Sequence, residues 1–207
     1  MNIGIIGTGN IGGNLAKLWA RAGHKLYLSF SHEYEKLEAL ASQLGTDAKA
    51  ATPYDAVYCS EVVVFSPPWR ATDEALKQMG KVDGKIVVDT TNPYINDNMD
   101  VQKFDENDSA SECNARKLEN ARVVKAFNTL RAQTLLDRSG QGLAIFYCSN
   151  DNVAKQKVAQ LIRDAGFEPV DAGTLHEGKK QEPNTDRYLK ELTREQAEAM
   201  VASATAK

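Results

Sequence analysis

Residues 1–23 read MNIGIIGTGNIGGNLAKLWARAG, and this stretch decides the fold. Its first seven residues form a short apolar run of the kind that is buried in a parallel sheet. The run Gly7-Thr8-Gly9-Asn10-Ile11-Gly12 has the spacing G-x-G-x-x-G, and apolar residues then repeat at helical spacing as far as Ala22. A strand, a glycine turn and an amphipathic helix in this order predict the first unit of a Rossmann-type, dinucleotide-binding domain.

The glycine turn predicts a pyrophosphate site. Gly7 permits the tight turn, Gly9 lets the backbone approach the phosphates, and Gly12 lets the helix pack closely on the strand. The free amides at the start of the helix would hydrogen-bond the phosphates. We therefore predict cofactor contacts from the turn, namely Gly7, Thr8, Gly9, Asn10, Ile11 and Gly12. A purely structural glycine turn is the alternative.

The rest of the chain continues the alternation of strands and helices. Further strands are expected at residues 26–29, 47–50, 61–65, 85–89, 122–126, 143–148 and 167–171. Helices are expected at residues 33–44, 54–59, 67–79, 109–118 and 151–165. This order predicts an α/β fold, a doubly wound and mainly parallel sheet with helices on both faces.

Two segments break the alternation. Residues 94–108 are rich in Asn and Asp and are expected to form a surface loop. Residues 174–207 form a polar C-terminal arm, in which Thr193-Arg194-Glu195-Gln196 has the pattern that opens a short helix. We therefore expect a dinucleotide-binding domain at residues 1–173 and an arm at 174–207.

Composition excludes several classes of protein. The 207 residues are 42% hydrophobic and 26% charged, enough for one sizeable core. A formal charge of −3 disfavours nucleic-acid binding. No apolar run reaches the ~18 residues of a membrane span, so no membrane partner is expected. Three cysteines without C-x-x-C spacing and the absence of a basic leader predict a cytoplasmic protein.

The loop after the second strand bears on the choice of dinucleotide. An NAD site usually carries Asp or Glu there to bind the ribose 2′-hydroxyl. Here the loop reads Ser29-Phe30-Ser31-His32, with no acid before Glu33. Because Ser29, Ser31 and His32 can donate hydrogen bonds to a 2′-phosphate, the loop favours NADP(H) over NAD. A polar loop without selectivity is the alternative.

Loops after three core strands should meet at one crevice, because ligands bind at the carboxyl ends of parallel strands. These loops read Ser66-Pro67-Pro68-Trp69, Thr91-Asn92-Pro93 and Phe127-Asn128-Thr129. We predict further cofactor contacts from Ser66, Pro67, Pro68, Asn92, Pro93 and Asn128. Phe127 or Trp69 would bound the hydride acceptor.

No residue is singled out as a catalytic acid, base or nucleophile. Lys125 is the best candidate for a proton donor, although its place within a strand favours a structural role. His24 follows a predicted helix end, which favours a helix-terminal role. Three scattered histidines predict no metal site. A reaction in which the bound cofactors carry the chemistry would need no such residue.

Several motifs together resemble a known family. They are the glycine turn, Ser66-Pro67-Pro68-Trp69, Asp89-Thr90-Thr91-Asn92-Pro93, Val123-Val124-Lys125-Ala126-Phe127-Asn128-Thr129 and residues 167–175. Over residues 1–175 the chain resembles the NADP-dependent oxidoreductases of the deazaflavin coenzyme F-420 family, and is similar to the reductase domain of the six-transmembrane metalloreductases. The resemblance implies NADPH, a deazaflavin or flavin as co-substrate and a homodimer.

The chain also departs from that family. His32 stands where members commonly carry Arg, and the polar arm replaces a longer helical segment of the larger members. Two other functions therefore stay open. One is an imine or carbonyl reductase of the pyrroline-carboxylate type, and the other is a non-catalytic NADP(H)-binding sensor.

Overall fold

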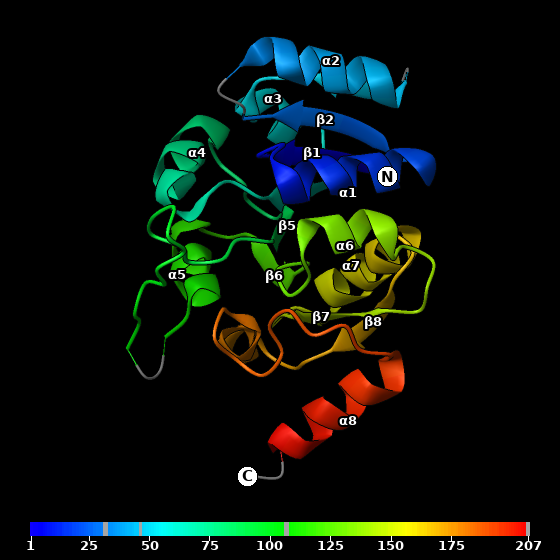
Figure 1. Ribbon diagram of the computed structural model, residues 1–207. Helices are drawn as coiled ribbons and strands as arrows, with labels where there is room; N and C mark the ends of the chain where they lie inside the picture. Colours follow the sequence, from blue (N-terminus) through cyan, green and yellow to red (C-terminus); the bar gives the residue numbers. More distant parts are fainter. Residues whose placement is uncertain (31–32, 46, 106–107, 206–207) are drawn as a thin grey trace.

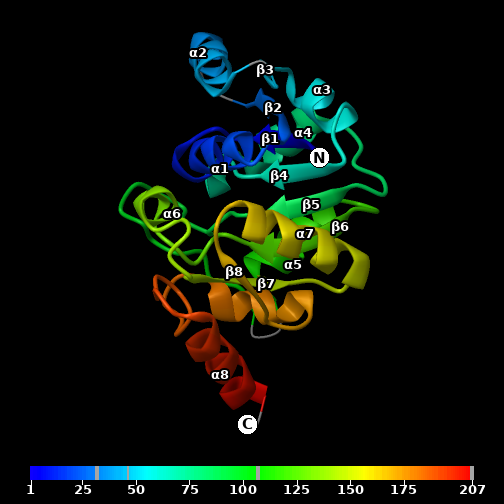
Figure 2. The same cartoon turned by 90° about the vertical axis from the view of Figure 1, so that its right-hand side faces the viewer.

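An eight-stranded sheet forms the centre of the molecule, with helices on both faces (Figures 1 and 2). The structure is a computed structural model that describes residues 1–30, 33–45, 47–105 and 108–205. The strands are β1 (Asn2–Ile6), β2 (Lys25–Ser29), β3 (Ala48–Ala50), β4 (Val62–Phe65), β5 (Ile86–Asp89), β6 (Arg122–Ala126), β7 (Ala144–Cys148) and β8 (Glu168–Asp171).

Helices connect these strands in the order that the sequence predicts. They are α1 (Asn10–Arg21), α2 (Tyr34–Leu44), α3 (Pro53–Tyr58), α4 (Thr72–Met79), α5 (Ala110–Lys117), α6 (Ala132–Asp137), α7 (Asn152–Asp164) and α8 (Arg194–Thr205). Two short 3₁₀ helices are η1 (Trp69–Ala71) and η2 (Leu175–Gln181). Helices α6 and η2 were not among the expected helices.

The sheet has the order β3-β2-β1-β4-β5-β6-β7-β8, and it confirms the predicted doubly wound α/β fold. Its pairs are parallel except β6 with β7, which run antiparallel with Lys125 opposite Cys148. An antiparallel neighbour must be entered from the edge at which the previous strand ends. The segment between β6 and β7 therefore begins and ends at the carboxyl edge of the parallel strands, and α6 within it packs against α1.

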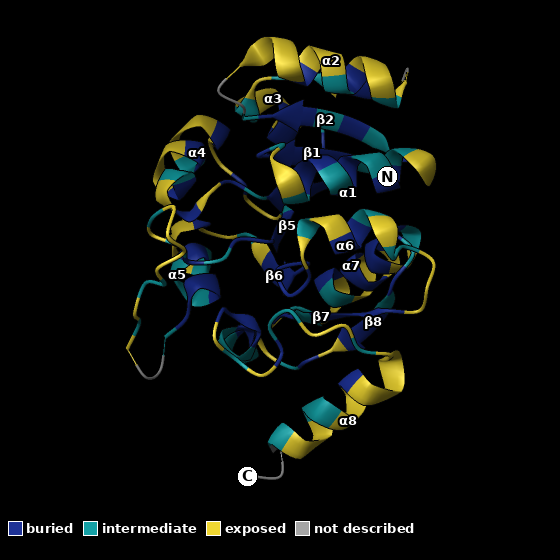
Figure 3. Ribbon diagram, viewed as in Figure 1, coloured by how far each residue is buried: buried dark blue, intermediate teal, exposed yellow. Residues whose placement is uncertain are grey.

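Apolar side chains fill the space on each side of the sheet. The central strands and the helix faces turned toward them are accordingly coloured as buried in Figure 3. Helices α1, α2, α6 and α7 cover one face, and α3, α4 and the end of α5 cover the other. Trp19 of α1 is fully buried and donates its indole N–H to the Leu161 carbonyl at 2.9 Å. Burial on both faces explains why the central strands are almost continuously apolar.

The C-terminal arm divides into two parts. Its first part lies against the domain, where the Leu189 amide donates to the Thr129 carbonyl at 2.8 Å and Arg187 is buried. Helix α8 extends from the end of the molecule and is largely exposed, although Ala197 is buried against β7 and β8 (Figure 3). Thr193 and Gln196 form the predicted capping contacts at its start. No helix in the described ranges is long and apolar enough to span a membrane.

Candidate functional site

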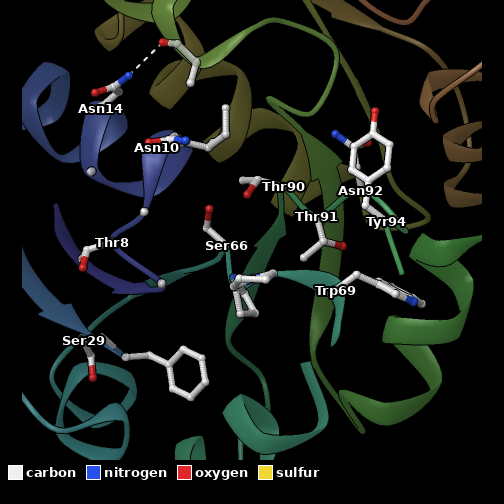
Figure 4. A pocket seen from close by; sticks show the side chains of 18 of the residues that line it. Thr8, Asn10, Asn14, Ser29, Ser66, Trp69, Thr90, Thr91, Asn92 and Tyr94 are labelled. Carbon is white, nitrogen blue, oxygen red and sulfur yellow. Dashed lines mark hydrogen bonds between the residues drawn. The ribbon is translucent and has the colours of Figure 1, made fainter. Parts of the chain in front are cut away.

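A cleft of about 1210 Å³ opens at the carboxyl edge of the parallel strands. Figure 4 shows Thr8 and Asn10 of the glycine turn on one side of it, and Trp69, Asn92 and Tyr94 on the other. The cleft therefore joins the predicted cofactor turn to the predicted reaction centre, as expected for this kind of sheet.

Three glycines shape the turn, each for a different reason. Gly7 has φ 99°, and a Cβ there would lie 2.5 Å from the Ser66 carbonyl oxygen. A Cβ on Gly12 would overlap the Gly7 carbonyl, so Gly12 lets α1 pack against the turn but does not line the cleft. A Cβ on Gly9 would meet no atom within 4 Å. Gly9 is thus the place at which a ligand can approach the backbone.

The start of α1 suits an anion. Gly9 is its N-cap, no side chain caps the helix, and no acidic residue lies in its first turn. The first backbone amides consequently lack side-chain partners and carry the positive end of the helix dipole. Thr8 and Asn10 also line the cleft here, together with Ile11. This arrangement fits the pyrophosphate of a dinucleotide.

The other end of the glycine turn leads to the loop after β2. Ser29 lines the cleft, and its buried hydroxyl oxygen has no hydrogen-bond partner among the described residues. Lys36, in the first turn of α2, also lines the cleft and pairs with Glu33 at 2.7 Å. Ser31 and His32, both predicted to bind the 2′-phosphate, lie outside the described residues.

Ser66, Pro67, Pro68 and Asn92 all line the cleft, as the sequence predicts. Asn92 is held from behind by the next loop, since its amide donates to the Asn128 carbonyl at 3.0 Å and its oxygen accepts from the Asn128 side chain at 3.1 Å. Asn128 and Pro93 are buried and do not line the cleft. Asn128 thus reaches the cleft only through Asn92.

The two aromatic residues predicted to bound the hydride acceptor lie in different places. Trp69 lines the cleft, donates to Gln102 at 2.6 Å and packs edge-on against Phe104. Phe127 is fully buried and packs edge-on against Trp19, with ring centroids 5.6 Å apart. The expectation for Phe127 is therefore wrong, because its ring packs in the core and does not line the cleft.

Lys125 has a structural role. Its side chain is fully buried, and its Nζ lies 3.2 Å from the equally buried Asp89 carboxylate and donates to the Thr91 carbonyl. Asp89 also accepts from the Thr91 amide and hydroxyl. This network links the ends of β5 and β6 behind the cleft, since a buried ammonium must be paired. His24 is likewise paired, with Asp164 at 3.0 Å.

Several lining residues were not predicted from the sequence. They come from the loop after β5 (Tyr94, Asn96, Asp97 and Met99), the segment after β6 (Leu130 and Arg131) and the C-terminal arm (Tyr188 and Leu189). The Tyr94 and Tyr188 hydroxyls hydrogen-bond at 2.8 Å. Burial raises the pKa of Tyr188 and the bond with Tyr94 raises it further, while the nearby Arg131 charge opposes this.

Titratable groups elsewhere do not form a second centre in the described ranges. Burial raises the pKa of the Cys148 thiol to about 12, which keeps it protonated. All three cysteines are free thiols. No group of three or more His, Cys, Asp or Glu side chains that could hold a metal ion occurs among the described residues.

The fold and the cleft define a class, the Rossmann-type dinucleotide-binding proteins. Within that class, residues 2–93 match the family described as "NADP oxidoreductase coenzyme F420-dependent". The predicted family resemblance is thereby confirmed, and it supports the predicted enzyme class, an NADP-dependent oxidoreductase.

Individual relatives agree with this result. A hypothetical protein from Sinorhizobium meliloti is 29% identical with a TM-score of 0.84, over 93% of this chain and 95% of that one. A protein from Arthrobacter proposed to be an F420-dependent NADP reductase is 26% identical with a TM-score of 0.76, over 94% and 100%. Mouse metalloreductase STEAP2 is 26% identical over 88% of this chain but 35% of its own length. The chain thus spans about a third of the length of the curated relatives it matches.

The fold also occurs in more distant enzymes. A reductive aminase from Aspergillus terreus has a TM-score of 0.64 at 17% identity, over 86% of this chain and 56% of that one. At this identity the likeness shows the shared fold alone.

Proposed function

We propose that the protein binds NADPH in the cleft and transfers its hydride to a flavin-like acceptor, a flavin or a deazaflavin. The observation that carries the proposal is one continuous cleft with an anion-binding helix start at one end and aromatic and amide side chains at the other. When bound, NADPH supplies a hydride and leaves as NADP⁺, and the acceptor takes up that hydride and a proton.

The residues of this chain would hold the two rings together. The amides after Gly9 bind the pyrophosphate, which fixes the direction of the dinucleotide in the cleft. Asn92, locked by Asn128, presents a fixed amide edge that suits the nicotinamide carboxamide. The prolines at 67 and 68 stiffen the facing wall. Holding reactants in place can by itself supply effective molarities of ~10⁵ M or more.

The residues of the cleft that follow β2 support selectivity for NADP(H). Ser29 offers a buried hydroxyl without a partner, and Lys36 carries a positive charge at the rim. The lysine can move from Glu33 to a 2′-phosphate, because their ion pair is exposed and exposed pairs contribute little. NADPH should therefore be used in preference to NADH.

A second candidate is the reduction of an imine or a carbonyl. The phenol pair of Tyr94 and Tyr188 favours it, because such a substrate needs a hydrogen-bond donor at its nitrogen or oxygen. Homodimerisation, with helix α8 as the exposed element, is a further proposal for the intact protein.

An acceptor screen tests both candidates. Oxidation of NADPH would be followed by absorbance with riboflavin, FMN, FAD, a deazaflavin, ferric chelates and cyclic imines. Turnover with flavins or the deazaflavin is the expected result. Turnover confined to the imines would replace the proposal with the second candidate. A NADH series under the same conditions tests the cofactor preference.

A further inference from the structure

The cationic side chains of the cleft differ in whether they are already paired. Among the described residues, the lysines and arginines that line it are Lys17, Lys36, Arg70 and Arg131. Lys36 and Arg70 are neutralised by carboxylates that lie 2.7 Å and 2.8 Å away. Lys17 and Arg131 make no ion pair with any residue that the structure describes. Their charges are therefore available to a ligand of the cleft.

Arg131 lies beside the start of α1. It directly precedes α6, and α6 packs against α1. The Asn14 side chain of α1 donates at 2.8 Å to the carbonyl of Ala132, the next residue, and Figure 4 draws this bond. Asn14 is four residues from Asn10, the first residue of the helix, which is about 6 Å along the axis. An extended arginine side chain spans that distance, so the exposed Arg131 guanidinium can reach the space in front of the first amides.

The diphosphate of a dinucleotide needs more positive charge than the helix supplies. Each of its phosphates is negative at neutral pH, whereas the start of a helix is equivalent to about half a positive charge. The first turn of α1 contains no charged side chain that could add to this. A guanidinium can form two parallel hydrogen bonds to a phosphate. Arg131 is better placed for this than Lys17, which lies three residues beyond Asn14 and thus farther from the helix start.

We propose that Arg131 binds the diphosphate of the dinucleotide from the α6 side of the cleft, and that Asn14 is the positioning residue that holds the Arg131 segment in place. The inference rests on the proposed binding of NADPH in the cleft and does not depend on the hydride acceptor. It gives the segment before α6 a role that no motif of the sequence indicates. Because NADPH and NADH both carry the diphosphate, Arg131 should strengthen the binding of both alike.

Fluorescence titrations with NADPH and NADH test the role of Arg131. Arg131→Gln should weaken the binding of each by about 10-fold or more, the loss expected for a hydrogen bond to a charged group. ADP-ribose keeps the diphosphate but lacks the nicotinamide, and should lose the same factor in calorimetric titrations. Arg131→Lys should retain part of the affinity, since it keeps the charge but not the paired donors. Arg21→Gln removes a charge from the last turn of α1, outside the cleft, and is the matched control that should leave all these affinities unchanged.

A double-mutant cycle tests the role of Asn14. Asn14→Ala removes the donor to the Ala132 carbonyl and should weaken NADH binding several-fold in the wild-type background. In the Arg131→Gln background the same change should have little effect on NADH binding, because it acts through the arginine. Urea unfolding of each variant separates a loss of binding from a loss of folding. Equal losses of affinity in the two backgrounds would refute the positioning role.

Any of three results would overturn the role of Arg131. They are unchanged affinities in Arg131→Gln, a loss confined to NADPH, which would assign the arginine to the 2′-phosphate, and a loss that spares ADP-ribose, which would assign it to the nicotinamide end. If the wild type bound none of these ligands, the proposed function would fail and this inference with it. The expected losses without reduction of any flavin would support the role of Arg131 and refute only the proposed hydride transfer.

Discussion

Replacing Gly9 with Asp should abolish dinucleotide binding while the protein still folds. The backbone of Gly9 has φ −69°, which any residue can adopt, and a Cβ would meet no atom within 4 Å. Its carbonyl already accepts the first helical bond, from Gly13 at 2.8 Å. Asp is also a preferred N-cap residue. The free energy of unfolding should thus change by no more than about 0.5 kcal/mol.

The loss of binding can be estimated from the same geometry. The new carboxylate would project into the space at the start of α1 that suits the phosphates, and it would compete for the same amides. At about 5 Å and an effective dielectric constant of about 20, one pair of negative charges repels by about 3 kcal/mol. This corresponds to binding that is at least about 100-fold weaker.

Gly9→Asn is the matched control, because asparagine has nearly the same shape and caps helices as well as aspartate. The difference in NADPH binding free energy between the two variants measures the effect of the added charge. The loss of NADPH binding free energy in Gly9→Asn measures the effect of the added side-chain bulk. Dissociation constants would come from NADPH fluorescence titrations, with urea unfolding as the test of folding. A folded Gly9→Asp protein that binds NADPH as tightly as the wild type would refute the pyrophosphate assignment. Equal losses in both variants would refute the electrostatic part.

Three other outcomes are expected. Gly12→Ala should lower the free energy of unfolding by about 1–3 kcal/mol in urea titrations, because its methyl group would overlap the backbone of the glycine turn. His32→Arg should increase the preference for NADPH over NADH near pH 8 in calorimetric titrations, since a guanidinium stays charged where imidazole is mostly neutral. Burial raises the pKa of Glu182 above its ordinary value of 4.5. The folded protein therefore binds the carboxyl proton more tightly than the unfolded chain does, and the free energy of unfolding falls as the pH rises above 4.5. Glu182→Gln keeps an oxygen for the Ala110 amide, 2.7 Å away, and should remove this fall in urea titrations between about pH 4 and pH 8; an unchanged slope would contradict the assignment.

The sequence alone determined the fold class and one end of the site. A buried strand, the turn from Gly7 to Gly12 and an amphipathic helix are contiguous, so their local geometry follows from short-range sterics and periodicity. The loops carrying Ser66 and Asn92 could be placed for a similar reason, because parallel strands all end at one edge. The antiparallel direction of β7 relative to β6 could not be predicted, since no residue pattern within the strand encodes its direction.

Only the tertiary structure decided what faces the cleft at the acceptor end. Phe127 and Asn128 are neighbours of a predicted site loop, yet one side chain turns into the core and the other supports Asn92 from behind. Tyr94 and Tyr188 are 94 residues apart, and neither carries a local signal for their contact. Side-chain direction and long-range pairing depend on how distant elements pack, and a pattern of neighbouring residues holds no record of that packing.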